Sequence, residues 1–175
     1  MKFTELEIKG VYLIEMEPFE DERGTFSRQY CKKELKKAGI DFDICQCNIS
    51  KNKHQGTIRG LHYQKRPYLE HKIVSCIKGR VYDVIVDLRC NSKTYLKWIG
   101  FEMSEDNNFA LYIPPMCAHG FQTMEDDSTV FYQLGEFFQK DYYDGIRYDD
   151  PKINIKWKNI EPVIINDRDK SYKLI

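Results

Sequence analysis

Hydrophobic and polar residues alternate with a period of two along most of this chain, which is the pattern of β-strands with one buried face. The clearest run covers residues 81–88. Successive side chains of a strand point to opposite faces of the sheet. One face of this strand is therefore expected to carry Tyr82, Val84, Val86 and Leu88, and the other Asp83, Ile85 and Asp87.

Short runs of this kind recur throughout the chain, separated by turn signals such as Asn91-Ser92. The predicted strands cover two N-terminal segments broken at Gly10 and residues 25–30, 43–50, 57–63, 72–77, 81–88, 95–103, 109–113 and 128–134. One convincing helix spans 31–38 and ends at Gly39. Many short strands predict an all-β sandwich or barrel with one or two short helices. No linker or repeat divides residues 1–175, so we predict a single domain.

Composition narrows the function classes. The 175 residues include 27 Lys and Arg and 27 Asp and Glu, so no overall positive charge favours nucleic acid as a partner. No apolar run approaches the ~18 residues of a membrane span, and the N-terminus lacks the apolar core of a signal peptide. Six cysteines without a C-x-x-C pair are expected to be reduced thiols. We therefore expect a cytoplasmic protein that contacts neither nucleic acid nor membrane.

One predicted hairpin would place opposite charges together. If Lys78-Gly79 is a two-residue turn, Val74 pairs with Asp83, and Lys72 lies one diagonal step from Asp83 on the same face. This Lys–Asp pair is either a solvated edge pair or a buried ionic site.

Histidines and isolated basic residues are the candidate chemical groups. His62 and His119 stand among strand-forming apolar residues, where a packed core role is the ordinary alternative to proton transfer. No H-x-H motif occurs, which speaks against a metal-binding β-sandwich site. A converging set of cations would suit a small anion such as a diphosphate, although surface scatter would explain most basic residues. The cations beside apolar strand segments are Arg23, Arg59, Lys72 and Arg168.

Arg59 and His62 can share one pocket only if the strand is irregular. Their positions differ by an odd number, so a regular strand sends them to opposite faces. A bulge at Gly60 would return both to one face.

Four sequence blocks resemble the dTDP-4-dehydrorhamnose 3,5-epimerases. They occur in the family's order, and the match runs from about Gly10 to the C-terminus. The blocks are Ile58-Arg59-Gly60-Leu61-His62-Tyr63-Gln64, residues 81–89, Ile113-Pro114-Pro115 with Ala118-His119-Gly120-Phe121, and residues 145–151. The resemblance implies a cupin-like jelly-roll sandwich and a homodimer whose N-terminal strands cross to the partner. It also implies a nucleoside-diphosphate 4-keto-6-deoxy sugar as substrate, inverted at C3, C5 or both, without metal or cofactor.

The resemblance also assigns catalytic roles residue by residue. His62 matches the base, Asp169 the carboxylate that orients it, and Tyr132 the proton donor. Lys72 matches the group beside the C4 oxygen, with Asp83 as its expected ion partner. Proton removal beside a ketone does need a base, an acid on the opposite face and a donor to the oxyanion.

Further positions match the family's substrate contacts, and three of them depart from its pattern. Arg28 and Tyr143 stand where the family often has Glu, and Phe138 stands where it has Tyr. Such changes alter which nucleotide edge can be bound. The implied substrate-binding set is Arg23, Phe26, Arg28, Gln46, Asn48, Arg59, His119, Phe138, Tyr143 and Arg168.

Three alternatives accompany this interpretation. The first is an epimerase selective for C3 or C5, acting on a GDP- or CDP-linked 4-keto sugar or heptose. The second is a metal-dependent cupin. The third is a sugar-binding module of the same fold, which would bind ligand without exchanging any sugar C–H with solvent.

Overall fold

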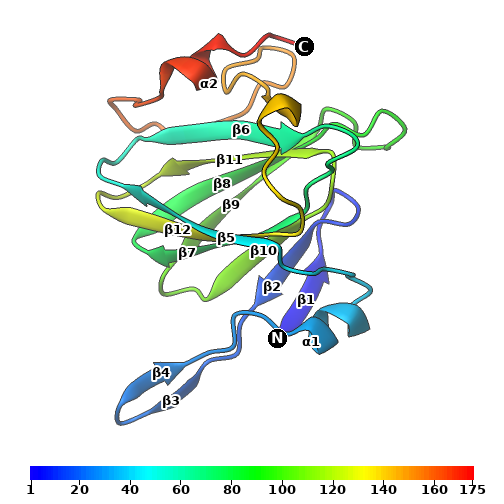
Figure 1. The fold of residues 1–175 in the computed structure, drawn as a ribbon. Helices are drawn as coiled ribbons and strands as arrows, with labels where there is room; N and C mark the ends of the chain where they lie inside the picture. Colours follow the sequence, from blue (N-terminus) through cyan, green and yellow to red (C-terminus); the bar gives the residue numbers. More distant parts are fainter.

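Two antiparallel sheets packed face to face form the body of the structure, a computed structural model that describes residues 1–175 (Figure 1). The six-stranded sheet has the order β1-β2-β10-β7-β12-β5, with bounds Lys2–Glu5, Tyr12–Glu15, Phe109–Ile113, Lys72–Lys78, Ser128–Leu134 and Gln46–Asn52. The five-stranded sheet has the order β13-β6-β11-β8-β9, with bounds Tyr143–Gly145, Ile58–Gln64, Cys117–Thr123, Arg80–Asp87 and Trp98–Ser104. The β-sandwich prediction is confirmed.

The remaining elements are short. Helix α1 covers Lys32–Lys37 and helix α2 covers Asp167–Ser171, with a 3-10 helix η1 at Lys140–Tyr142. None of these helices is long and apolar enough to cross a membrane. Strands β3 (Phe19–Asp21) and β4 (Gly24–Phe26) pair only with each other, and the resulting hairpin projects from the sandwich (Figure 1).

The side chains of β8 alternate between the two faces of the sheet, as predicted for residues 81–88. Val81 and Ile85 belong to the apolar core between the sheets. The opposite face of β8 packs outward against Ile146, Ile153 and Ile155 of the C-terminal segment. That outer cluster contains Tyr82, Val84, Val86 and Leu88.

The predicted hairpin of residues 72–88 is wrong. Strand β7 pairs with β10 and β12, whereas β8 pairs with β11 and β9, so the chain passes from one sheet to the other at Gly79. The reason is that both segments are buried on both faces, as expected of central strands covered on each side. Their adjacency in sequence does not make them neighbours in a sheet.

The structure contains the bulge at Gly60 that Arg59 and His62 need in order to share one pocket. On β11, His119 and Phe121 are two residues apart, but they pair with His62 and Arg59 of β6, which are three apart. The extra residue turns both polar side chains toward the space between the sheets. Gly60 has φ +124°, and a Cβ there would lie 2.6 Å from Cα of Gly120.

Replacing Gly60 with alanine should destabilise the protein by about 2–4 kcal/mol, because the new methyl group collides with backbone as well as adopting an unfavourable φ. Gly39→Ala is a matched control, since Gly39 has φ +81° but nothing within 4 Å of its Cβ position. The control should cost only about 1 kcal/mol. Urea denaturation monitored by fluorescence measures both values, and equal losses would contradict the close-approach argument.

Five elements were not predicted: β3, β11, η1, β13 and α2. Every residue of β11 is buried, so its sequence has no alternation between polar and apolar positions. Strand β13 and helix α2 have three and five residues, too short for a periodic signal. Both nevertheless place side chains at the site described next.

Candidate active site

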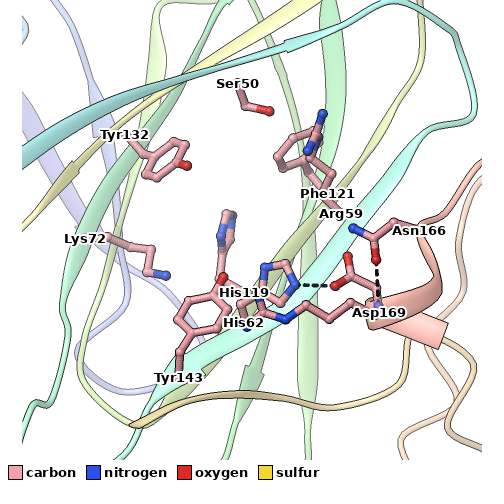
Figure 2. A pocket seen from close by; sticks show the side chains of 11 residues that line it. Ser50, Arg59, His62, Lys72, His119, Phe121, Tyr132, Tyr143, Asn166 and Asp169 are labelled. Atoms are coloured by element: carbon pink, nitrogen blue, oxygen red, sulfur yellow. Dashed lines mark hydrogen bonds and ion pairs between the residues drawn. The ribbon is translucent and has the colours of Figure 1, made fainter. Parts of the chain in front are cut away.

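A cavity of about 240 Å³ lies between the two sheets at the end covered by α2, and we call it the inner pocket (Figure 2). Side chains reach it from β5, β7 and β12 of one sheet and from β6, β11 and β13 of the other. The lining residues are Ser50, Arg59, His62, Lys72, His119, Phe121, Tyr132, Tyr143, Asn166, Arg168 and Asp169.

The imidazole of His62 is held by a buried carboxylate. Its Nε2 lies 2.8 Å from Oδ1 of Asp169, which is 1% exposed (Figure 2). With the Nε2 proton donated to this carboxylate, neutral His62 carries its lone pair on Nδ1. Burial lowers the pKa of His62 below its ordinary value, against the opposing effect of Asp169. The ring is therefore a neutral proton acceptor at pH 7.

Local structure keeps Asp169 in place. Asn166 caps α2, and its Oδ1 accepts a hydrogen bond from the backbone N–H of Asp169 at 2.7 Å. The second carboxylate oxygen of Asp169 accepts the N–H of Gly60 at 3.0 Å. Burial favours a higher pKa for Asp169, but the hydrogen bonds from His62 and Gly60 outweigh it and hold the pKa below its usual range. Asp169 thus stays ionised beside His62.

Tyr132 and Lys72 come from the opposite wall. Strand β12 pairs with β7 so that Leu134 lies opposite Lys72, which puts Tyr132 one diagonal step from Lys72 on the same face. In Figure 2 the Tyr132 hydroxyl and the Lys72 ammonium point into the cavity across from His62. Burial, with the nearby charge of Glu70, raises the pKa of Tyr132, so its hydroxyl stays protonated.

Asp83 pairs with a histidine instead of the predicted lysine. Its Oδ2 lies 2.7 Å from Nε2 of His119, and both side chains are nearly buried. Lys72 forms its ion pair with Glu70. Because β8 adjoins β11 and not β7, the diagonal neighbour of Asp83 is His119. Burial raises the pKa of Asp83 despite this partner.

A second cavity of about 470 Å³, the outer pocket, adjoins the inner one. The two share Lys72, Tyr132, Tyr143 and Arg168. The guanidinium of Arg168 lies 4.6 Å from the centre of the Tyr143 ring, a cation–π contact at the junction. The outer pocket adds Gln46, Asn48, Ile49, Glu70, Leu134 and Phe138.

Three predicted binding residues lie outside both pockets. Arg23 and Phe26 belong to the β3–β4 hairpin, where the Arg23 side chain is 84% exposed and contacts Asp21. Arg28 donates to Glu34 of α1 at 2.7 Å. The chain by itself does not bring these groups to the cavity.

Six pocket-lining residues were not predicted from the sequence: Ile49, Ser50, Glu70, Phe121, Leu134 and Asn166. Ser50 and Phe121 lie two positions from Asn48 and His119, so the period of two was a usable signal. Asn166 could have been found from its helix-capping spacing to Asp169. Nothing in the sequence marked Glu70. No group of three or more His, Cys, Asp or Glu side chains is arranged to hold a metal ion.

Comparison with known proteins identifies the family of this chain. Residues 5–175 match the family model described as dTDP-4-dehydrorhamnose 3,5-epimerase. The epimerase of that name from Shigella flexneri is 38% identical, with 97% of this chain and 93% of the relative covered.

Solved structures are similar over nearly the whole chain. The dTDP-4-dehydrorhamnose 3,5-epimerase from Bacillus anthracis, with TDP and PPi bound, superposes with a TM-score of 0.96 at 37% identity and covers 99% of each chain. A 3'-monoepimerase from Streptomyces bikiniensis in complex with dTDP-quinovose has a TM-score of 0.92 at 27% identity, covering 97% of this chain and 86% of the other. The protein therefore belongs to the dTDP-4-dehydrorhamnose 3,5-epimerase family.

Proposed function

We propose that this protein inverts C3 and C5 of dTDP-4-dehydro-6-deoxyglucose by proton transfer through an enolate. The observation that carries the proposal is the arrangement of the inner pocket. A neutral imidazole held by Asp169 stands on one wall, and a protonated phenol stands on the other. A removed proton can then be replaced from the opposite face of the sugar ring.

The first half of the reaction is proton removal. Nδ1 of His62 takes the proton from the carbon beside the C4 ketone, and the C–H electron pair becomes the C=C bond of the enolate. The carbonyl π electrons move to O4, where the Lys72 ammonium stabilises the negative charge. Ionised Asp169 stabilises the imidazolium. A positioned base contributes about 10²–10⁴ in rate, and one oxyanion donor about 10²–10³.

The second half returns a proton with inversion. The enolate collapses to the ketone as the carbon takes the hydroxyl proton of Tyr132 from the other face. The cycle leaves a phenolate and an imidazolium, and proton exchange with water restores both before the second carbon reacts. Solvent hydrogen therefore enters the product at each inverted carbon.

The two pockets suit the two ends of a sugar nucleotide. The inner pocket is small and lined by Arg59, Lys72 and Arg168, which supports binding of the ketosugar with its diphosphate nearby. The larger outer pocket, with Gln46, Asn48 and Phe138, would take the nucleoside. Bound TDP in the similar structure at 37% identity favours a thymidine nucleotide.

The deciding experiment follows hydrogen exchange in D₂O. The protein is incubated with dTDP-4-dehydro-6-deoxyglucose and, separately, with GDP- and CDP-linked 4-keto sugars, and NMR identifies the deuterated carbons. We expect deuterium at C3 and C5 of the dTDP sugar. Deuterium at C3 alone would establish the second candidate, a selective epimerase, which the similarity to the 3'-monoepimerase favours. Absence of exchange from every sugar would refute an epimerase function.

We also propose that two copies of the chain complete each other's outer pocket. Phe19 and Phe26 of the β3–β4 hairpin are 65% and 76% exposed. An isolated two-stranded hairpin is only marginally stable, and two large apolar side chains left in solvent indicate a contact surface. The family resemblance matches Arg23 and Phe26 to nucleotide contacts, yet both lie away from the pockets of their own chain. A symmetric dimer would let each hairpin reach the partner's pocket.

Mixing two impaired variants should restore activity. The double variant Arg23→Ala with Phe26→Ala is expected to raise KM ~10–100-fold, from lost charge-assisted and apolar contacts. His62→Ala keeps the hairpin but lacks the base. Each mixed dimer then holds one complete site, so a one-to-one mixture should regain about a quarter of wild-type activity at low substrate concentration. Activity that stays at the sum of the two variants, or a monomer in sedimentation, would contradict the shared pocket.

A further inference from the structure

Glu70 is a buried carboxylate at the junction of the two pockets with no role in the mechanism above. It lies two residues before Lys72, the first residue of β7, and is 6% exposed. Its carboxylate forms an ion pair with the Lys72 ammonium, and Oε1 has no other partner. Lys72 is 7% exposed and has no second ion pair. The two charges therefore depend on each other.

Glu70 and Lys72 occupy different positions at the junction between the two pockets. Lys72 lines both pockets, whereas Glu70 lines only the outer one. The carboxylate thus holds the ammonium from the outer side, and the remaining N–H groups are free for the inner pocket. An ammonium has three donors on a flexible four-carbon stem, so without an anchor it loses entropy whenever it must stay in one place.

The lining of the outer pocket offers no substitute anchor. The charge of Lys72 also acts on the buried Asp83, but that carboxylate is held by His119 through Oδ2 and forms no ion pair with the ammonium. The other charged or titratable side chains that line the outer pocket are Tyr132, Tyr143 and Arg168. Arg168 is a cation that repels the ammonium, and both phenols are protonated, because burial and the charge of Glu70 raise their pKa values. Glu70 is the only carboxylate in the lining of the outer pocket. Asp169 of the inner pocket is already occupied by His62 and Gly60.

We propose that Glu70 is a positioning residue that anchors the Lys72 ammonium, so that its free N–H groups point at the oxygen that becomes negative in the enolate. This inference rests on the proposed function. In this arrangement Lys72 donates to the enolate oxygen and Glu70 holds Lys72 in position, so Glu70 acts only through Lys72. A correctly placed donor matters most when charge develops, so its loss affects the chemical step more than substrate binding.

The test is a double-mutant cycle on the full-length protein. Glu70→Gln keeps the shape but removes the charge, and it should lower kcat ~10-fold while the dissociation constant of dTDP changes less than twofold. In a Lys72→Met background the same Glu70→Gln change should alter kcat less than twofold. Glu102→Gln is the matched control, because Glu102 pairs with Lys158 at 2.6 Å outside both pockets, and its kcat should stay at the wild-type value.

Each other outcome overturns the inference. Equal effects of Glu70→Gln with and without Lys72 would show that Glu70 acts independently, for example by binding a sugar hydroxyl itself. An unchanged kcat would show that the pair has no function. If Glu70→Gln does not fold, Glu70→Asp keeps the charge but withdraws the carboxylate by one methylene, and it must also lower kcat. Failure of the proposed function is distinguishable, because the wild-type protein would then exchange no sugar hydrogen in D₂O.

Discussion

Replacing His62 with asparagine should lower turnover by about 10⁴-fold or more, the largest effect expected in this protein. His62 is the only imidazole of the inner pocket that is held by Asp169, because the second one, His119, is paired with Asp83. Asparagine can still accept a hydrogen bond but cannot accept a proton at neutral pH. The measurement is deuterium incorporation at C3 and C5 under single-turnover conditions, with the affinity for dTDP determined by calorimetry.

The control for this variant is His54→Asn, because His54 is exposed at the surface and lies outside the pockets. It should retain wild-type exchange. Affinity for dTDP should be preserved in both variants, since binding relies on the cations and the outer pocket. If His62→Asn still exchanged solvent hydrogen at more than one hundredth of the wild-type rate, His62 would not be the base.

Changing Tyr132 to phenylalanine should separate proton removal from inversion. The ring remains in β12, but the hydroxyl that faces His62 across the cavity is gone. His62 can still form the enolate and return hydrogen to the same face, so deuterium should enter without inversion. Formation of the inverted product should fall ~10²–10⁴-fold, the contribution of a positioned acid.

The readout is the ratio of deuterium exchange to inverted product at each carbon. Tyr63→Phe is the matched control, because Tyr63 is next to His62 on β6 but packs in the outer apolar cluster. It should behave as wild type. Inversion by Tyr132→Phe at the normal rate would assign the donor to another group, and a difference between C3 and C5 would show which carbon depends on Tyr132.

Much of the site could be predicted because it depends on local pattern. The period of two placed Ile85 and Val84 on opposite faces of β8, and both ended in the expected layers. Arg59 and His62, at an odd spacing, can share one pocket only with a bulge at Gly60, and the strand pairing contains that bulge. These inferences need only the geometry of one strand, which neighbouring residues determine.

Other features depended on contacts between distant segments. Lys72 and Asp83 are close in sequence and oppositely charged, which made a hairpin pair plausible, but their strands joined different sheets. The partners they found, Glu70 and His119, could not be chosen from charge alone. Asp169 reached His62 only because a five-residue helix covers the end of the sandwich.

The amino-acid sequence by itself determined most of the strands, their buried faces, the family and most of the residues that could do chemistry. The tertiary structure alone decided which strands are neighbours, which charges pair and which side chains share a cavity. The physical reason is that the order of polar and apolar residues within one short segment decides whether it forms a strand and which of its faces is buried. Which of several equally apolar strands become neighbours in a sheet depends on the packing of the whole sandwich.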